Sequence, residues 1–130
     1  MAEINDAVLW VGDVAVKSGL GDQTSYAMQV CVEEALTNIV RHGHCAIGPG
    51  EIELELTVTN GGARIEVEDD CVPFDMTAAA PSRPHNDPAD PEVGGWGRGL
   101  IRAFASRLAY RREGERNRLT LEFDPVPARG

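Results

Sequence analysis

Apolar residues recur at helical spacing in the first 42 positions of the chain, and after residue 51 they change to strict alternation. Two helices are predicted in the first part, one over residues 5–18 and one that begins after Asp22 and ends at about His42. Asp22 suits the N-terminal end of a helix because its carboxylate accepts hydrogen bonds from free backbone amides. The second helix is predicted to carry its apolar face on Met28, Val32, Ala35, Leu36 and Ile39.

Two strands and a tight turn are predicted next. In residues 51–58, EIELELTV, every second residue is apolar and most of the others are glutamates, which is typical of a strand with one solvated face. Residues 60–62, NGG, are a strong signal for a hairpin turn. The return strand alternates in the same way, which puts Asp69 on the buried side. Because a buried carboxylate is costly without hydrogen bonds, Asp69 is a candidate functional residue.

The second half of the chain begins with an irregular segment. Residues 72–93 contain five prolines and no periodicity, which excludes a helix or a central strand. Loops of this length inside a domain are usually functional, so we interpret residues 72–94 as a lid. A third helix is predicted with Leu100, Ile101, Phe104 and Leu108 on its apolar side. A hairpin follows, with a strand over residues 108–112, a turn around residues 113–115 and a last strand that places Asn117 on its apolar face. Residues 124–130 are predicted to be frayed.

This order of elements predicts an α+β fold, with a mixed or antiparallel sheet covered on one face by helices. The 130 residues fit a single domain, residues 1–130. A net charge of -9 disfavours binding to nucleic acids and to anionic membranes, and no apolar run approaches the about 20 residues that span a bilayer. Three cysteines without metal-like spacing, and an N-terminus unlike a signal segment, favour a reducing cytoplasm.

A glycine-rich segment, GGWGRGL, precedes the predicted third helix. Gly95, Gly97 and Gly99 lie where free backbone amides and the positive end of the helix dipole favour a phosphate group. No Lys-Ser/Thr pair follows the last glycine and no strand precedes the segment, which disfavours P-loop and dinucleotide-binding folds. A flexible linker would also account for these glycines when they are taken alone.

Glu34, Asn38 and His42 share one face of the second helix, beside its apolar stripe. The amide oxygen of Asn38 is a suitable ligand for Mg²⁺. One turn earlier, the carboxylate of Glu34 is placed to act as a general base toward an attacking hydroxyl. Glutamate and asparagine are also common on solvated helix surfaces, so this row alone leaves both interpretations open.

Four motifs together resemble the GHKL superfamily of ATPases, which has the Bergerat fold. They are EEALTNIVRHGH, VEDDCVPFD, GGWGRGLIRAF and YRREGERNRLTLEF. Within the superfamily they look like the small anti-sigma-factor serine/threonine kinases of RsbW type, over residues 20–123. The resemblance implies a two-layer α/β sandwich that uses ATP and Mg²⁺. The chain departs from the family at Cys71, where glycine is usual, and at Trp96, where an aliphatic residue is common.

The resemblance also implies roles for individual residues. Glu34 would be the catalytic base, and Asn38 would hold Mg²⁺. Asp69 would accept a hydrogen bond from the adenine amino group, with Asn117 near the adenine. The residues that would wrap the phosphates are Gly95, Gly97, Gly99 and the adjacent Leu100.

The function implied by the resemblance is that of a cytoplasmic anti-sigma factor that is also a kinase. It would sequester a sigma factor and phosphorylate a STAS-type anti-anti-sigma protein, and it is expected to form a homodimer. Two alternatives stay open at this point. One is a non-catalytic nucleotide-sensing binding module, because Cys71 adds a side chain beside the adenine pocket. The other is a switch kinase that activates a different regulator.

Overall fold

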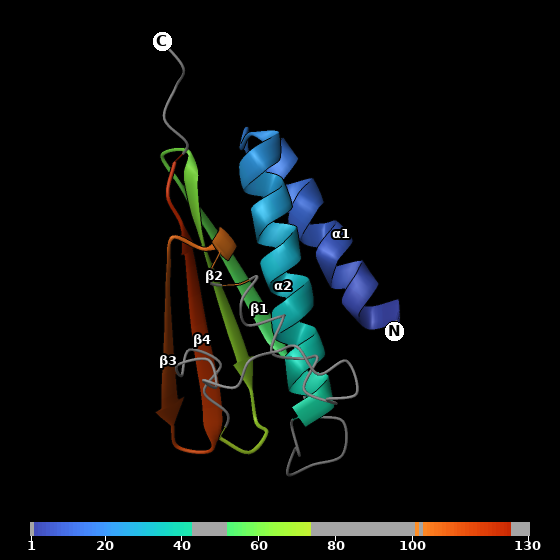
Figure 1. Ribbon diagram of the computed structural model, residues 1–130, viewed down its shortest axis with the longest axis vertical. Coiled ribbons are helices and arrows are strands. Elements are labelled where there is room, and N and C mark those ends of the chain that lie inside the picture. The colour runs from blue at the N-terminus through green and yellow to red at the C-terminus, as the bar shows by residue number, and fades with distance from the viewer. Residues whose placement is uncertain (1, 43–51, 74–100, 102, 126–130) are drawn as a thin grey trace, which may run out of the picture.

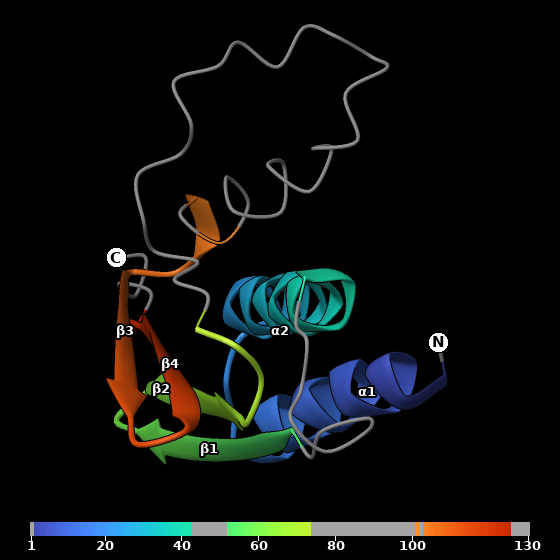
Figure 2. The ribbon, with the colours of Figure 1, turned by 90° about the horizontal axis from the view of Figure 1, so that it is seen from below.

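The computed structural model describes residues 2–42, 52–73, 101 and 103–125 of the chain. Their helices and strands are α1 (Ala2–Lys17), α2 (Asp22–His42), β1 (Glu53–Thr59), β2 (Gly62–Asp69), β3 (Arg107–Glu113) and β4 (Arg116–Phe123). The strands form one sheet in the order β1-β2-β4-β3, and each neighbouring pair is antiparallel. Both helices lie on the same side of this sheet (Figures 1 and 2), so the α+β, two-layer prediction is confirmed.

The hydrophobic core lies between α2 and the inward face of the sheet. The apolar face predicted for α2 is buried, and Met28 and Val32 at its centre are 0% exposed. Helix α1 packs beside α2 and contributes Val11 and Ala15 to the same core. The helical and alternating patterns of the sequence therefore meet in one apolar layer, as expected for a sheet covered on one face.

The strand register arranges the inward residues in rows that cross β2, β4 and β3. Most of these rows are apolar. They include Ile65, Leu121 and Leu108, and then Val67, Leu119 and the ring of Tyr110. At the end of β2 the next row is polar and consists of Asp69, Asn117 and Arg112, which we call the polar row. The core thus ends in three hydrogen-bonding side chains that lie next to one another.

The predicted turn between β1 and β2 is confirmed at Asn60 and Gly61, whose φ angles are 46° and 84°. Positive φ at both central residues is the geometry of a type I′ turn, which matches the right-handed twist of the flanking strands. The turn fixes the register of β2 against β1. That register sets which residues of β2 face the core, and Asp69 is among them.

The predicted third helix is wrong at its C-terminal end. Residues 101, 103 and 104 are helical, and the backbone N–H of Ala105 donates to the carbonyl oxygen of Ile101 at 2.9 Å. The next N–H, of Ser106, donates to the carbonyl oxygen of Glu122 in β4 at 2.7 Å. The chain is therefore already extended at Leu108, which pairs with Leu121. Leu108 thus belongs to the predicted hairpin strand, which is confirmed as β3, and not to the helix. Leu108 fits both the helical and the alternating pattern, so local spacing does not separate them.

Several predictions fall on residues outside the described ranges. Of the predicted lid, residues 74–94 belong there, as does most of the predicted frayed tail, residues 126–130. Among the described helices, none is long and apolar enough to cross a membrane.

Candidate functional site

The candidate site lies at one end of the molecule. Figure 1 shows that the C-terminal end of α2 and the C-terminal end of β2 lie at this same end. Glu34 and Asn38 belong to the C-terminal half of α2, and Asp69 is the last residue of β2. The two-layer fold therefore brings a helix and a strand that are distant in the sequence to the same end of the molecule.

Asp69 is buried, with 4% of its surface exposed, as the alternation in β2 predicts. Its Oδ1 accepts two hydrogen bonds, from the backbone N–H of Cys71 at 2.9 Å and from Nδ2 of Asn117 at 2.8 Å. These bonds offset the cost of removing the carboxylate from water. The geometry thus holds a buried hydrogen-bond acceptor in a defined orientation at the end of the core.

Asn117 forms hydrogen bonds both with the residues at the end of β2 and with side chains of β3. Its Nδ2 also lies 3.0 Å from the carbonyl oxygen of Val72 and 3.3 Å from that of Cys71. Its Oδ1 accepts hydrogen bonds from the Tyr110 hydroxyl and from Nη1 of Arg112, the latter at 3.1 Å. Asn117 is next to Asp69, and its amide is engaged by protein groups on both sides. Its assignment to the nucleotide stays a prediction.

The row on α2 is more buried than a solvated helix face. Asn38 is 2% exposed, and its Nδ2 has no hydrogen-bond partner among the described residues. An unsatisfied buried donor typically costs about 1–3 kcal/mol, so this amide is suited to meeting a ligand. A phosphate oxygen could accept from Nδ2, while the amide oxygen is the type of ligand that Mg²⁺ prefers. Asn38 therefore fits a site for a magnesium-bound nucleotide.

Glu34 is partly buried, one turn before Asn38. Burial raises the pKa of its carboxyl group, the neighbouring charge of Glu33 raises it further, and Arg41 lowers it. A raised pKa makes the carboxylate a stronger base, as the role of proton acceptor requires. Arg41 is exposed, and His42 is the last residue of the helix.

Cys31 lies on the same helix but belongs to the core. Its side chain is 0% exposed, and its Sγ lies 4.0 Å from the carbonyl oxygen of Ile101. Burial, followed by the charge of Glu34, raises the pKa of this thiol to about 12. A thiol with so high a pKa is inert at neutral pH, which agrees with a structural role.

Cys71 occupies the position where glycine is usual, and it is 2% exposed. The φ angle of Cys71 is not positive, because among the described non-glycine residues only Asn60 has a positive φ. The backbone at Cys71 therefore does not require glycine. Its backbone carbonyl accepts a hydrogen bond from Nη1 of Arg112 at 2.7 Å. Its sulfur is bonded in a disulfide.

The other predicted site residues, Gly95, Gly97, Gly99 and Leu100, lie outside the described residues. Sequence reasoning missed Tyr110 and Arg112, which complete the hydrogen bonds of Asn117. Alternation along β3 puts both on the same face as Leu108, but only the register with β4 shows that Arg112 lies opposite Asn117. That pairing is not visible in the local sequence.

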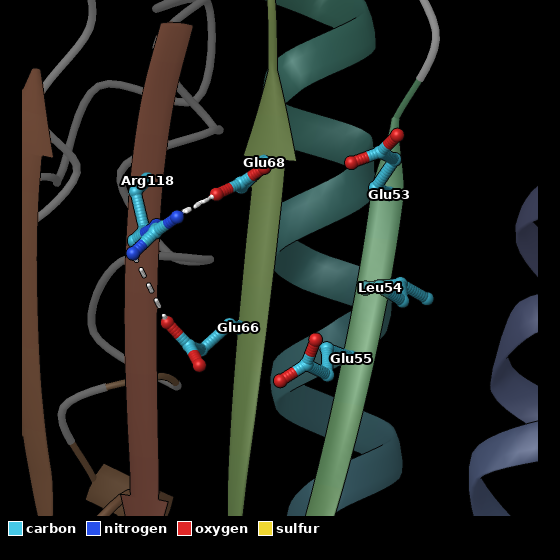
Figure 3. A pocket seen from close by; sticks show the side chains of 6 residues that line it. All are labelled: Glu53, Leu54, Glu55, Glu66, Glu68 and Arg118. Carbon is cyan, nitrogen blue, oxygen red and sulfur yellow. Dashed lines mark hydrogen bonds and ion pairs between the residues drawn. The ribbon is translucent and has the colours of Figure 1, made fainter. Parts of the chain in front are cut away.

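A separate hollow lies on the open face of the sheet, away from the helices (Figure 3). It has a volume of about 530 Å³ and is lined by Glu53, Leu54, Glu55, Glu66, Glu68 and Arg118. Figure 3 shows Arg118 between Glu66 and Glu68, with α2 behind the sheet. Nε of Arg118 donates to Glu68 at 2.7 Å, and this hydrogen bond is the main cause of the lowered pKa of Glu68. The hollow is not part of the candidate site, because the sheet separates it from α2.

Comparisons with known proteins agree with this fold. The family profile described as "Histidine kinase-like ATPase domain" matches residues 1–123. The serine/threonine-protein kinase BtrW of Bordetella bronchiseptica is 30% identical over 122 residues, which cover 94% of this chain and 86% of that protein.

Solved structures with the same fold come from the blue-light activated histidine kinase EL346 of Erythrobacter litoralis. Its histidine kinase domain aligns with a TM-score of 0.54 and 22% identity, over 78% of this chain and 44% of that one. A longer structure of the same kinase aligns with a TM-score of 0.57 and 22% identity, over 80% of this chain and 31% of that one. The chain spans less than half of each, and this likeness bears on the fold alone.

Proposed function

Because the chain belongs to the histidine kinase-like ATPase family, we propose that it is an anti-sigma factor and an ATP-dependent serine/threonine kinase. Its protein substrate would be a STAS-type anti-anti-sigma protein. The observation that carries the proposal is the burial of Asn38, whose amide donor lacks a partner among the described residues, one turn after the partly buried Glu34. The homology to BtrW, a serine/threonine-protein kinase, supports the kinase assignment.

The site residues would divide the work of phosphoryl transfer. Mg²⁺, when bound, neutralises charge on the phosphates of ATP, and Asn38 would hold it through the amide oxygen. Asp69 would accept a hydrogen bond from the adenine amino group. Glu34 would take the proton of the serine or threonine hydroxyl as that oxygen bonds to the γ-phosphorus and ADP leaves. The raised pKa of Glu34 suits this role, because a stronger base accepts the proton more readily.

The second candidate is a nucleotide-sensing module that binds a partner without transferring phosphate. The buried Cys71 favours it, because its side chain lies two residues after Asp69, where the resemblance implies a glycine with only a hydrogen atom. The backbone conformation of Cys71 argues the other way, since it accommodates a side chain without strain. We therefore place the kinase first.

The proposed partners are a sigma factor and the STAS-type protein, with a homodimer as the active form. Both partners would place the protein in the cytoplasm. Disulfides in that compartment are usually transient, so the Cys71 disulfide would be labile there. Experiments on nucleotide binding should therefore be run with and without a reductant.

The test is isothermal titration calorimetry of ATP in the presence of MgCl₂. Wild type should bind, and Asp69→Asn should weaken binding by about tenfold to a hundredfold, because it replaces a charged acceptor. Glu66→Gln is the matched control, since it changes a carboxylate of the same strand that lines the hollow on the open face of the sheet, and its ATP binding should equal that of the wild type. Glu34→Gln should retain ATP binding and lose transfer of labelled phosphate to a STAS protein.

Two results would overturn this division of roles. If the wild-type protein does not bind ATP, either with or without reductant, the proposal that it is an ATP-dependent enzyme is wrong. Equal loss of ATP binding in Asp69→Asn and Glu34→Gln would mean that Glu34 is not a base separate from the binding site. Normal binding without any phosphate transfer in the wild type would favour the non-catalytic module.

A further inference from the structure

The hydrogen bonds around Asn117 fix the orientation of its amide group. Arg112 has only donors, so the amide atom that faces its Nη1 must be the oxygen. The other amide atom faces three acceptors, Oδ1 of Asp69 and the carbonyl oxygens of Cys71 and Val72, so it must be the nitrogen. An asparagine flip would reverse all of these contacts, and the side chain is 5% exposed, so water cannot readily replace them.

Tyr110 completes this arrangement. Its hydroxyl donates to the same Oδ1 of Asn117 that accepts from Arg112, so both lone pairs of that oxygen are used. Both donors come from the inward face of β3, which is an edge strand of the sheet. Strand β3 therefore orients the amide of Asn117, on β4, so that its N–H donors point toward β2.

As a consequence, the two carboxylate oxygens of Asp69 have different roles. Among the described residues, Oδ1 takes both of the hydrogen bonds to this carboxylate, which leaves Oδ2 as the acceptor for a ligand. Adenine carries an amino group, which is a donor, where guanine carries a carbonyl oxygen, which is an acceptor. A carboxylate oxygen held in one place accepts from adenine and repels guanine, whereas a mobile carboxylate can turn away.

We propose that Tyr110, Arg112 and Asn117 are positioning residues that set the preference of the site for adenine over guanine nucleotides. They would do so by holding Asp69 through Asn117, without contacting the nucleotide themselves. This inference rests on the proposed function, since it assumes that Asp69 reads the base. It extends the proposed function by giving a role to two residues of β3 and by stating which base the site prefers.

The experiment measures the affinities for ATP and for GTP by calorimetry, each with MgCl₂, on the full chain. Tyr110→Phe removes one hydroxyl and keeps the half-buried ring, so it should fold. It should weaken ATP binding about three- to tenfold, the effect of losing one hydrogen bond, and change GTP binding less, so the ratio of the two affinities falls. Asn117→Asp places a carboxylate against Asp69 and should lower the same ratio further.

Arg111→Gln is the matched control. Arg111 neighbours both Tyr110 and Arg112 on β3 but points to the open face of the sheet, where it pairs with Glu113 at 3.2 Å. Its ATP to GTP ratio should equal that of the wild type. The melting temperature of each variant without nucleotide separates a loss of stability from a loss of base preference.

The outcomes distinguish this inference from the proposed function. If wild type binds ATP and Asp69→Asn binds it more weakly, but Tyr110→Phe keeps the wild-type ratio, the positioning role is wrong and the proposed function stands. An equal weakening of ATP and GTP in Tyr110→Phe, or a reduced ratio in Arg111→Gln, would also overturn the inference. If wild type does not bind ATP, the proposed function and this inference fall together.

Discussion

At the scale of single residues, the side chains of Glu34 and Asn38 both lower the stability of the folded protein. Asn38 is buried with an unsatisfied donor among the described residues, and Glu34 keeps a carboxyl group in a place where burial disfavours its charge. Apolar residues at these positions would pack against the same core without such a cost. Residues that disfavour folding are typical of functional sites, where activity and stability make opposite demands.

The first prediction concerns Glu34→Gln. The pKa of Glu34 is raised in the folded protein, so between its unfolded and folded pKa values the folded state binds more protons and stability falls as pH rises. Glu34 therefore lowers stability at pH 7, and this effect disappears below the ordinary pKa of glutamate, about 4.3. Thermal unfolding should show Glu34→Gln melting higher than wild type at pH 7 and level with it near pH 4.

Glu33→Gln is the control for that prediction, because Glu33 is exposed on the same helix turn. Its melting temperature should differ little from that of the wild type at either pH. A Glu34→Gln protein that melts lower than wild type at pH 7 would show that the carboxylate stabilises the fold, against the reasoning from burial.

At the scale of elements, the β1–β2 turn determines which side chains reach the site. A change of one residue in the register of β2 would move Asp69 from the inward to the outward face. The turn depends on positive φ at Asn60 and Gly61. The strand that carries Asp69, the proposed adenine acceptor, is thus aligned by two residues at its opposite end.

The second prediction tests this turn through Gly61→Ala. Gly61 has a φ of 84°, where an alanine side chain is strained, so the variant should lose about 1–2 kcal/mol of unfolding free energy. Gly21→Ala is the matched control, since Gly21 has open space around its Cα and no positive φ. Urea denaturation of both variants measures the difference. Equal stability of the two would mean that the turn is not conformationally restricted.

The third prediction concerns the charged rows on the open face of the sheet. Glu53 lies directly opposite Glu68, and Glu55 opposite Glu66, so like charges face each other across β1 and β2. Arg118 offsets this repulsion by its contacts with Glu66 and Glu68. Arg118→Gln should therefore lower the melting temperature at pH 7, and more so than Arg111→Gln, which removes a single exposed pair.

The pH dependence of that effect has a definite sign. The pKa of Glu68 is lowered by its hydrogen bond from Arg118, so the stabilisation is present above the unfolded pKa of glutamate and is lost as pH falls through the folded value. The difference between Arg118→Gln and wild type should therefore shrink in acid and in high salt. A difference that stays constant from pH 7 to acid would show that packing, rather than charge, is lost.

Much of the fold followed from local pattern, because helical spacing and alternation are properties of short segments. Alternation alone placed Asp69 inside, and the structure confirms its burial. The end of the third helix and the roles of Tyr110 and Arg112 did not follow, since they depend on the pairing of β3 with β4. A hydrogen bond between two strands is decided by register, which the local sequence specifies only weakly.

At the scale of the whole molecule, the site draws its residues from elements that share one core. Helix α2 provides Glu34 and Asn38, and β2 provides Asp69. β4 provides Asn117, which donates to Asp69, and β3 provides the two side chains that donate to Asn117. A ligand bound at this end would contact both layers of the sandwich shown in Figure 2. The proposed nucleotide should therefore stabilise the domain as one unit rather than a single loop.

The fourth prediction follows from that arrangement. A ligand that binds only the folded state stabilises it by about 2.7 kcal/mol when its concentration is 100 times its dissociation constant. ATP with MgCl₂ should raise the unfolding temperature of wild type equally by far-UV circular dichroism, which follows the helices, and by tryptophan fluorescence, because small domains unfold in one step. Asp69→Asn should show a smaller shift at the same ATP concentration, because binding weakened tenfold to a hundredfold leaves only about 0.4–1.4 kcal/mol of stabilisation. A shift in fluorescence without one in circular dichroism would mean that the nucleotide orders only part of the chain, and that α2 is not part of its site.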